Sequence, residues 1–284
     1  MTTIAEILRE ASFALEAAGS PTSRLDAEVL LSHCLKLDRL RFYTHSEQAL
    51  SSEATEDYAK KIDRRKKGEP ISYIVGVKEF WSLPFQVDPS VLIPRPETEV
   101  LVEEALVIMS ERREPGWRVL EIGTGSGAVA VALASERRNI HVTATDLSGE
   151  ALAVAKGNAE RNGVEGRVLF LQGDLFEPVT GQYDMIVSNP PYISRHDFGL
   201  LPLGIKDYEP SRALLAGPEG IEFHRELIFK GASFLERGGW LLMEMGEGQG
   251  QNIRECFETQ DGYEEVGIRS DYGGTERVIK ARRK

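Results

Sequence analysis

The feature that most constrains the fold of this chain is a regular alternation of strand-like and helix-like stretches that starts near residue 117. Short apolar, β-branched segments alternate with longer helical ones, which is typical of an α/β sheet covered by helices on both faces. The four leading strands are expected over 118–122, 140–145, 167–171 and 183–187. Later elements are expected as helices over 128–135, 219–236 and 249–258, a strand over 238–243, and a closing antiparallel pair over 263–268 and 277–281. In such a sheet, ligand-binding residues gather at the carboxyl ends of the strands.

The first of these strands runs into the glycine-rich segment Gly123-Thr-Gly-Ser-Gly127, which is typical of nucleotide binding. Glycines let the backbone approach a ligand, and the following helix presents unpaired N–H groups at its start. With Ala128, the segment also satisfies the G-x-G-x-x-A form of the dinucleotide pattern. Asp146 follows about twenty residues later and suits a ribose diol. The alternative for Asp146 is an N-cap for the helix from Ser148.

The third strand ends in Gly173-Asp174-Leu175-Phe176. At this position, Asp174 could hold the amino group of an adenine, and the apolar pair after it could contact the face of the ring. The alternative for Asp174 is a residue that merely forms a turn.

The fourth strand ends at Asn189-Pro190-Pro191-Tyr192, which forms a stiff and extended bracket. Neither proline can donate to a sheet ladder, and each restricts the residue before it to an extended conformation. Asn189 and the Pro190 carbonyl offer acceptors, and Tyr192 offers an aromatic face. Such a bracket suits a planar amide or amino group, whose two N–H bonds need two acceptors. The pattern therefore favours group transfer to nitrogen, with Asn189, Pro190 and Tyr192 as catalytic residues, over a loop that simply ends a strand.

The first seventy residues predict a separate helical bundle. Thr3 and Glu6 have the spacing of a capping box, and apolar residues follow at helical spacing up to Gly19. Further helices are expected over 23–37 and 51–67. The stretches 73–77, 78–81 and 83–87 are short, β-branched and aromatic, so they predict a hairpin linker. The expected domains are therefore 1–70 for the bundle, 71–92 for the linker and 93–284 for the α/β domain.

Between the hairpin and the sheet, residues 92–99 read Leu-Ile-Pro-Arg-Pro-Glu-Thr-Glu and precede an apolar-periodic helix. Pro96 suits the first turn of that helix. Arg95, between two prolines, is fixed in direction and is a candidate for contact with the substrate. The alternative is a surface arginine that pairs with Glu97 or Glu99.

Composition limits the classes of partner. The chain has 284 residues, with 45 acidic and 34 basic side chains and a net charge of -11, which disfavours a surface built to grip nucleic-acid phosphates. Cys34 and Cys256 lie far apart without metal-ligand spacing, so no metal is expected. No run approaches the ~18 apolar residues of a membrane span, so we expect a cytoplasmic protein without a membrane partner.

Several motifs together carry a resemblance to a known family. They are Leu92-Ile-Pro-Arg-Pro-Glu-Thr-Glu99, Gly123-Thr-Gly-Ser-Gly127, Thr145-Asp146, Asn189-Pro-Pro-Tyr192, Tyr208-Glu-Pro210 and Gly273-Gly-Thr-Glu-Arg-Val278. In this combination the chain resembles the peptide chain release factor glutamine methyltransferases over essentially its whole length. The stretch 93–99 is more diagnostic than the glycine-rich segment, which related methyltransferases share.

The resemblance implies a seven-stranded, Rossmann-like class I methyltransferase domain whose last strand is antiparallel, with S-adenosylmethionine as cosubstrate. Its implied cosubstrate-binding residues are Gly123, Thr124, Gly125, Ser126, Gly127, Asp146, Asp174, Leu175 and Asn189. Family members often carry Trp where this chain has Leu175, and Phe176 could take part of the contact with the adenine.

The resemblance also implies the methyl acceptor, the glutamine in the Gly-Gly-Gln motif of class I peptide chain release factors. Its implied substrate-binding residues are Asn189, Pro190, Pro191, Tyr192 and Arg95. The helical bundle would recognise the release factor, and no direct nucleic-acid partner is expected.

Three other functions stay open on the residues alone. The Asn-Pro-Pro-Tyr bracket also occurs in methyltransferases that modify adenine or guanine amino groups in nucleic acid, which must grip phosphates and often flip a base. The glycine-rich segment is compatible with a dehydrogenase, although the double proline has no role there. An adaptor that binds S-adenosylmethionine without catalysis would also keep these motifs.

Overall fold

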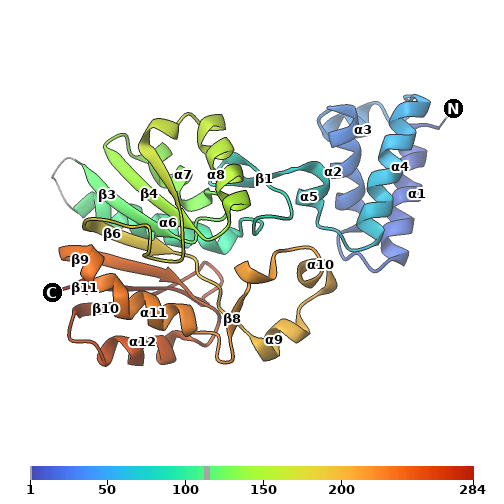
Figure 1. Ribbon diagram of the computed structural model, residues 1–284. Helices are drawn as coiled ribbons and strands as arrows, with labels where there is room; N and C mark the ends of the chain where they lie inside the picture. Colours follow the sequence, from blue (N-terminus) through green and yellow to red (C-terminus); the bar gives the residue numbers. More distant parts are fainter. Residues whose placement is uncertain (1, 112–115) are drawn as a thin grey trace. The chain divides into compact units, whose positions relative to one another are not determined.

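The computed structural model describes residues 2–111 and 116–284, and the chain divides into two compact units (Figure 1). The helical unit comprises the chain up to Val77 together with Pro202–Tyr208, and the sheet unit comprises Lys78–Leu201 and Glu209–Lys284.

The helical unit is a bundle built on apolar residues at helical spacing. Its helices are α1 (Ile4–Ala17), α2 (Ser23–Leu35), α3 (Leu40–Thr44), α4 (Ser52–Lys66), α5 (Ile71–Val75) and α10 (Leu203–Lys206). The predicted capping box is present: the Thr3 hydroxyl accepts from the Glu6 N–H, and the Thr3 N–H donates to the Glu6 carboxylate. Leu8, Leu30 and Tyr58 meet in one apolar core, so burial of the three long helices holds the unit together.

The strand predicted over 73–77 is wrong, because Ile71–Val75 forms the short helix α5. Tyr73 and Ile74 are buried, and Ile74 belongs to the core of the helical unit. Packing against the bundle therefore overrides the β-branched character of this stretch. Gly76 adopts a left-handed conformation (φ 75°) that ends the helix.

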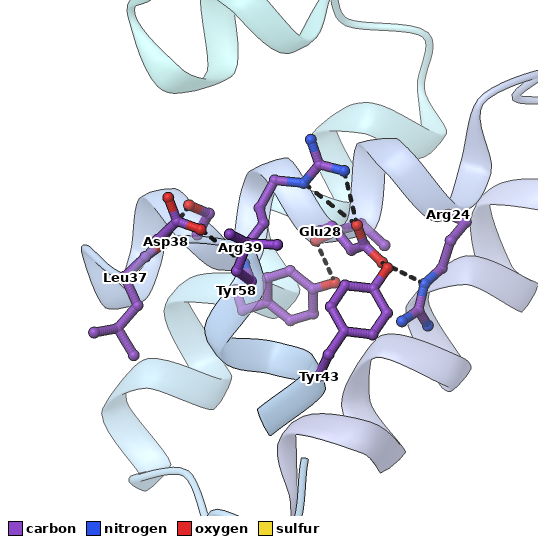
Figure 2. A network of polar contacts seen from close by, with 10 residues as sticks. Arg24, Glu28, Leu37, Asp38, Arg39, Tyr43 and Tyr58 are labelled. Atoms are coloured by element: carbon purple, nitrogen blue, oxygen red, sulfur yellow. Dashed lines mark hydrogen bonds and ion pairs between the residues drawn. The ribbon is translucent and has the colours of Figure 1, made fainter. Parts of the chain in front are cut away.

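One polar network joins α2 to the α3 region of the bundle (Figure 2). The buried Glu28 carboxylate accepts hydrogen bonds from Arg24 Nε (2.7 Å), Arg39 Nη2 (3.0 Å) and Tyr43 Oη (2.8 Å). Burial alone would raise the pKa of Glu28, but the bonds from Tyr43, Arg39 and Arg24 outweigh it and hold the pKa below its ordinary value.

The sheet unit contains one seven-stranded sheet in the order β10-β11-β9-β6-β3-β4-β5. Its strands are β3 (Trp117–Ile122), β4 (Ile140–Asp146), β5 (Val168–Gln172), β6 (Tyr183–Ser188), β9 (Leu235–Glu244), β10 (Tyr263–Ser270) and β11 (Glu276–Arg283). The pairs from β9 to β5 are parallel, and β11 is antiparallel to both its neighbours. The predicted seven-stranded α/β fold with an antiparallel last strand is confirmed.

Two apolar layers cover the faces of this sheet. Successive residues of β3 alternate between them, with Val119 in one cluster and Leu120 in the other. The first layer packs α6 (Glu99–Glu111), α7 (Ala128–Glu136) and α8 (Gly149–Arg161), and the second packs α11 (Glu222–Gly231) and α12 (Gly250–Glu258). The helix predicted over 219–236 is shorter, because a 3-10 turn at Ala232–Phe234 leads directly into β9.

The predicted hairpin is present as β1 (Val77–Phe80) and β2 (Leu83–Gln86). Phe80 and Phe85 meet edge to face, with ring centroids 5.9 Å apart, and both belong to the first layer of the sheet unit. The structure thus divides the chain near Val77, and the functional boundaries at residues 70 and 92 stay a prediction. The remaining elements are α9 (Arg195–Leu200), the two-stranded pair β7 (Ile193–Ser194) and β8 (Leu215–Gly217), and 3-10 turns at Pro96–Thr98, Glu165–Arg167 and Ser211–Ala213.

We expect Glu28→Gln to lower the free energy of unfolding of the helical unit by about 1–3 kcal/mol near neutral pH, because two guanidinium groups lose their anionic acceptor. The folded-state pKa of Glu28 lies below its ordinary value of 4.5, so its contribution is present above that value and is lost as the pH falls through the folded-state pKa. Urea unfolding followed by circular dichroism at about pH 7 and about pH 3 measures the difference, which should shrink in acid. Glu16→Gln, at an exposed position of α1, is the matched control. Equal differences at both pH values would contradict this account.

Candidate active site

The carboxyl ends of β6, β3, β4 and β5 meet at one edge of the sheet, where the structure has a cavity of about 580 Å³. This volume lies within the range of small-molecule sites. The strand order reverses between β3 and β6, which is where open α/β sheets place their ligands. The cavity is lined by five short segments that lie within residues 89–98, 121–129, 145–151, 173–175 and 188–191, together with a few residues of 210–226.

Four residues of the glycine-rich segment, Gly123 to Ser126, line this cavity, whereas Gly127 is not among its described lining residues. Gly123 and Gly125 adopt left-handed conformations (φ 73° and 55°), and a Cβ at either would meet no other atom within 4 Å. Gly127 has a different role: its Cβ would lie 3.1 Å from the Ala155 Cβ, so glycine allows α7 and α8 to pack closely. The segment therefore leaves open space beside the backbone where a ligand would lie.

Asp146 ends β4 and holds the glycine-rich segment in place. Its Oδ2 accepts from Gly125 N (2.8 Å), and its Oδ1 accepts from Ser148 N (2.9 Å). The helix that follows is capped by the Ser148 hydroxyl, which accepts from Ala151 N. The alternative interpretation of Asp146 as the N-cap is therefore wrong, and its carboxylate, which lines the cavity, keeps lone pairs for a further donor.

Glu121, in β3, is a cavity residue that the sequence interpretation missed. Its side chain is only 3% exposed, and its Oε2 accepts from Thr124 Oγ1 (2.7 Å) and from Ala130 N (3.1 Å). Burial raises the pKa of Glu121 to about 8, which the bonds from Thr124 and Ala130 only partly offset, and the negative charge of Asp146 raises it further. An acidic residue inside an apolar strand was the available signal, because buried carboxyl groups are rare without a partner or a role.

After β5, Asp174 and Leu175 line the cavity. Leu175 adopts a left-handed conformation (φ 45°) and its carbonyl accepts from Thr145 Oγ1. Phe176 is 5% exposed and stacks on Phe234 at 4.7 Å between ring centroids, within the second apolar layer. The suggestion that Phe176 shares a contact with the ligand is therefore wrong, and Leu175 is the apolar residue of this pair that faces the cavity.

The Asn189 side chain is held by a hydrogen bond from a distant segment. Its Nδ2 donates to Thr98 Oγ1 (3.1 Å), and both residues line the cavity. This bond leaves the Asn189 Oδ1 as an acceptor. Among the hydrogen bonds of residues 2–111 and 116–284, none reaches Asn189 Oδ1 or the carbonyl of Pro190. The two acceptors predicted for the bracket are thus both without a donor.

Tyr192 differs from the other three residues of the bracket in its position relative to the cavity. Asn189, Pro190 and Pro191 line the cavity, whereas Tyr192 is not among its described lining residues. The Tyr192 hydroxyl donates to Glu244 Oε1 (3.4 Å), and its carbonyl accepts from Gln249 Nε2 (2.8 Å). Burial raises the pKa of Tyr192 to about 12, so the hydroxyl stays protonated. The predicted aromatic cover over an acceptor group therefore stays a prediction.

Arg95 lines the cavity and is tied to a segment more than a hundred positions away. Its Nη2 donates to Glu209 Oε1, and the other oxygen of Glu209 accepts from Ile93 N (3.2 Å). Glu209 is 4% exposed, so this is a buried anchor. The alternative pairing of Arg95 with Glu97 or Glu99 is therefore wrong.

Carboxyl groups outnumber cations around the cavity. The lining carboxyl side chains are Glu121, Asp146, Glu150, Asp174 and Glu226, and the lining cations are Arg95 and Arg212. Since Arg95 is already paired, the cavity favours a ligand that carries positive charge over one that carries phosphates.

In residues 2–111 and 116–284 there is no group of three or more His, Cys, Asp or Glu side chains that could hold a metal ion. Over the same residues, no helix has the length and apolar character to cross a bilayer.

Comparison with known proteins identifies the class first. Residues 6–76 match the PrmC N-terminal domain, and residues 98–200 match the methyltransferase small domain. A methyltransferase structure from Pyrococcus furiosus has a TM-score of 0.52 and 23% identity, covering 72% of this chain and 91% of that chain. The fold and the matched domain are those of a class I methyltransferase.

The particular family follows from relatives that align over nearly the whole chain. The release factor glutamine methyltransferase of Aliivibrio fischeri is 41% identical over 277 residues, which are 97% of this chain and 95% of the relative. That of Escherichia coli is 41% identical over 276 residues, which are 97% of each protein. The chain therefore belongs to the release factor glutamine methyltransferase family.

Glu121→Gln should become more stable relative to the wild-type protein as the pH rises. The pKa of Glu121 is raised from its ordinary value of 4.5 to about 8, so its contribution to stability is present below 4.5 and is lost as the pH rises through about 8. Glutamine has no such dependence. Urea unfolding between about pH 5 and about pH 9 measures this. Parallel stability profiles for the two proteins would contradict the raised pKa.

Proposed function

We propose that this protein transfers a methyl group from S-adenosylmethionine to the side-chain amide nitrogen of the glutamine in the Gly-Gly-Gln motif of class I peptide chain release factors. The observation that carries this proposal is the pair of free acceptors at the cavity, Asn189 Oδ1 and the Pro190 carbonyl. A primary amide has two N–H bonds on one nitrogen, and two acceptors from adjacent residues suit it.

The cavity residues fit S-adenosylmethionine as cosubstrate. The open space beside Gly123 and Gly125 accommodates a ligand against the backbone, and Asp146 keeps lone pairs for the ribose hydroxyls. Asp174 would accept from the adenine amino group while Leu175 contacts the ring. The excess of carboxyl groups suits a molecule that carries a sulfonium and an ammonium group.

S-adenosylmethionine, when bound, supplies a methyl group on a positively charged sulfur, so the enzyme need not activate the methyl carbon. The obstacle lies in the acceptor, because the lone pair of an amide nitrogen is delocalised into its carbonyl. Asn189 Oδ1 and the Pro190 carbonyl would each accept one N–H bond and so favour a more pyramidal, nucleophilic nitrogen. The stiff Pro190-Pro191 segment fixes these two acceptors, and such positioning contributes several kcal/mol.

The site and the charge of the chain argue against the two other enzymatic interpretations of the motifs. A dehydrogenase would leave the acceptors of Asn189 and Pro190 at the end of β6 without a role. A nucleic-acid acceptor requires cations for its phosphates, whereas this chain has a net charge of -11.

The helical unit, which matches the PrmC N-terminal domain, would recognise the release factor. In this proposal, residues 1–70 recognise the release factor, residues 71–92 form the linker and residues 93–284 catalyse methyl transfer. Because release factors act on ribosomes, the activity would be cytoplasmic.

Mass spectrometry of a class I release factor incubated with this protein and S-adenosylmethionine tests the proposed function. We expect the Gly-Gly-Gln peptide to gain the mass of one methyl group. A release factor with alanine in place of that glutamine is the matched control and should gain nothing. Methylation elsewhere on the release factor, or none on it, would contradict the proposal.

Asn189→Ala should reduce turnover by at least ~100-fold, because the acceptor amide loses one of the two oxygens that hold it. Cosubstrate affinity should change little, since the glycine-rich segment and Asp146 remain. Asn139→Ala, at an exposed position before β4, is the control and should behave like the wild-type protein. Steady-state kinetics and calorimetric titration of the cosubstrate measure the two effects. If turnover of Asn189→Ala stayed within a few-fold of wild type, the bracket mechanism would be wrong.

A further inference from the structure

A buried carboxyl group that the mechanism above does not use lies directly behind the bracket. Glu244 is the last residue of β9, which pairs with β6 so that Met243 lies opposite Ser188. Glu244 therefore comes at the level where the chain of β6 continues into Asn189. Its side chain is 1% exposed, so the carboxyl group belongs to the interior and makes no contact with solvent.

The surroundings of this carboxyl group connect it to both polar side chains of the bracket. Tyr192 Oη donates to Glu244 Oε1 (3.4 Å), whereas Glu244 Oε2 has no hydrogen-bond partner of good geometry among the described residues. The Thr98 side chain lies close enough to stabilise the ionised carboxylate, and Thr98 is the residue that holds Asn189 Nδ2. A buried polar atom without a partner in a native fold calls for an explanation.

The direction of the hydrogen bond between Asn189 and Thr98 indicates a partner for Glu244 Oε2. Thr98 Oγ1 accepts from Asn189 Nδ2, so the proton of the Thr98 hydroxyl must point to another acceptor. Thr98 stabilises the ionised Glu244, and the Glu244 carboxylate is the acceptor to which we assign this proton, since its Oε2 has no partner among the described residues. A protonated Glu244 is a weaker acceptor and carries a proton of its own, so it would no longer fix the direction of the Thr98 hydroxyl.

We propose that Glu244 is a positioning residue for the methyl-acceptor site: as a carboxylate it holds Thr98 and Tyr192, and through Thr98 it keeps the Asn189 oxygen available to the acceptor amide. The inference rests on the proposed function for its kinetic consequences. It adds that the charge of a residue outside the cavity lining sets the orientation of the residue that binds the acceptor.

The charge state of Glu244 changes near neutral pH. Burial raises its pKa to about 7, with Thr98, Arg277 and Tyr192 acting in the opposite direction and Glu97 adding to the rise. His224, from α11, contacts the backbone carbonyl of Glu244 through Nε2 (2.8 Å). Burial lowers the pKa of His224 to about 4, so that ring stays neutral across the same range. The bracket should therefore lose its orientation as the pH falls below about 7.

The kinetic test is the pH dependence of kcat for wild type, Glu244→Gln and Glu104→Gln. We expect the wild-type kcat to fall on the acid side of about pH 7. Glu244→Gln should lower kcat by ~100-fold above that pH and remove the acid limb, with little change in cosubstrate affinity. Glu104 is also a buried carboxylate (6% exposed), bound by Arg269 and Lys280 and not among the residues that line the cavity. Its glutamine variant should keep the wild-type profile. A Glu244→Gln enzyme with wild-type kcat and an intact acid limb would overturn the proposal.

A second pair of variants keeps the test decisive if Glu244→Gln fails to fold. Thr98→Val removes the hydroxyl at nearly constant shape and should reproduce the loss of kcat and of the acid limb, whereas Thr98→Ser keeps the hydroxyl and should restore both. Full activity of Thr98→Val would overturn the proposal.

A spectroscopic readout separates this inference from the proposed function. In NMR spectra of the free protein, the chemical shift of the Asn189 side-chain NH2 group should change with pH, with a midpoint near pH 7. The Glu244→Gln variant should show no such change. If the wild-type protein methylates no release factor but this shift is present, the proposed function fails and the positioning role stands. If methylation occurs and the shift is absent, only the positioning role fails.

Discussion

The hydrogen bond from Asn189 Nδ2 to Thr98 Oγ1 is the interaction on which the site depends. An asparagine amide can turn over and exchange its donor for its acceptor, so a fixed partner is needed to decide which one faces the cavity. Thr98, in the 3-10 turn before α6 and far away in sequence, is that partner when its own proton is directed elsewhere. With the amide fixed in this orientation, Asn189 Oδ1 and the Pro190 carbonyl are both hydrogen-bond acceptors. A group with two N–H bonds therefore suits this part of the cavity.

The parallel ladder of the sheet brings the other participants to this point. Because β6, β3, β4 and β5 are neighbours and run the same way, the residues that follow them share one edge. Asp146 then ties the glycine-rich segment to the end of β4 through Gly125, and Glu121 ties it to β3 through Thr124. The position of the cavity therefore follows from the order of the strands in the sheet, and its acidic lining favours a positively charged ligand.

The sequence predicted the parts of this arrangement that have local causes. Periodicity located the strands, and glycine and proline marked the turns that follow β3 and β6. The sequence-based prediction failed where contacts between distant segments determine the structure. Arg95 pairs with Glu209 instead of with Glu97 or Glu99. The β-branched stretch before Gly76 forms a helix because it packs against the helical bundle. Phe176 was misjudged for the same reason, since its partner Phe234 lies on another element.

The most direct measurement is a crystal structure of the protein with S-adenosylhomocysteine and a release factor or its Gly-Gly-Gln peptide. The account predicts that the glutamine amide nitrogen lies within hydrogen-bond distance, ~3 Å, of both Asn189 Oδ1 and the Pro190 carbonyl. A glutamine side chain that docks elsewhere, with these two oxygens bound only to water, would contradict it.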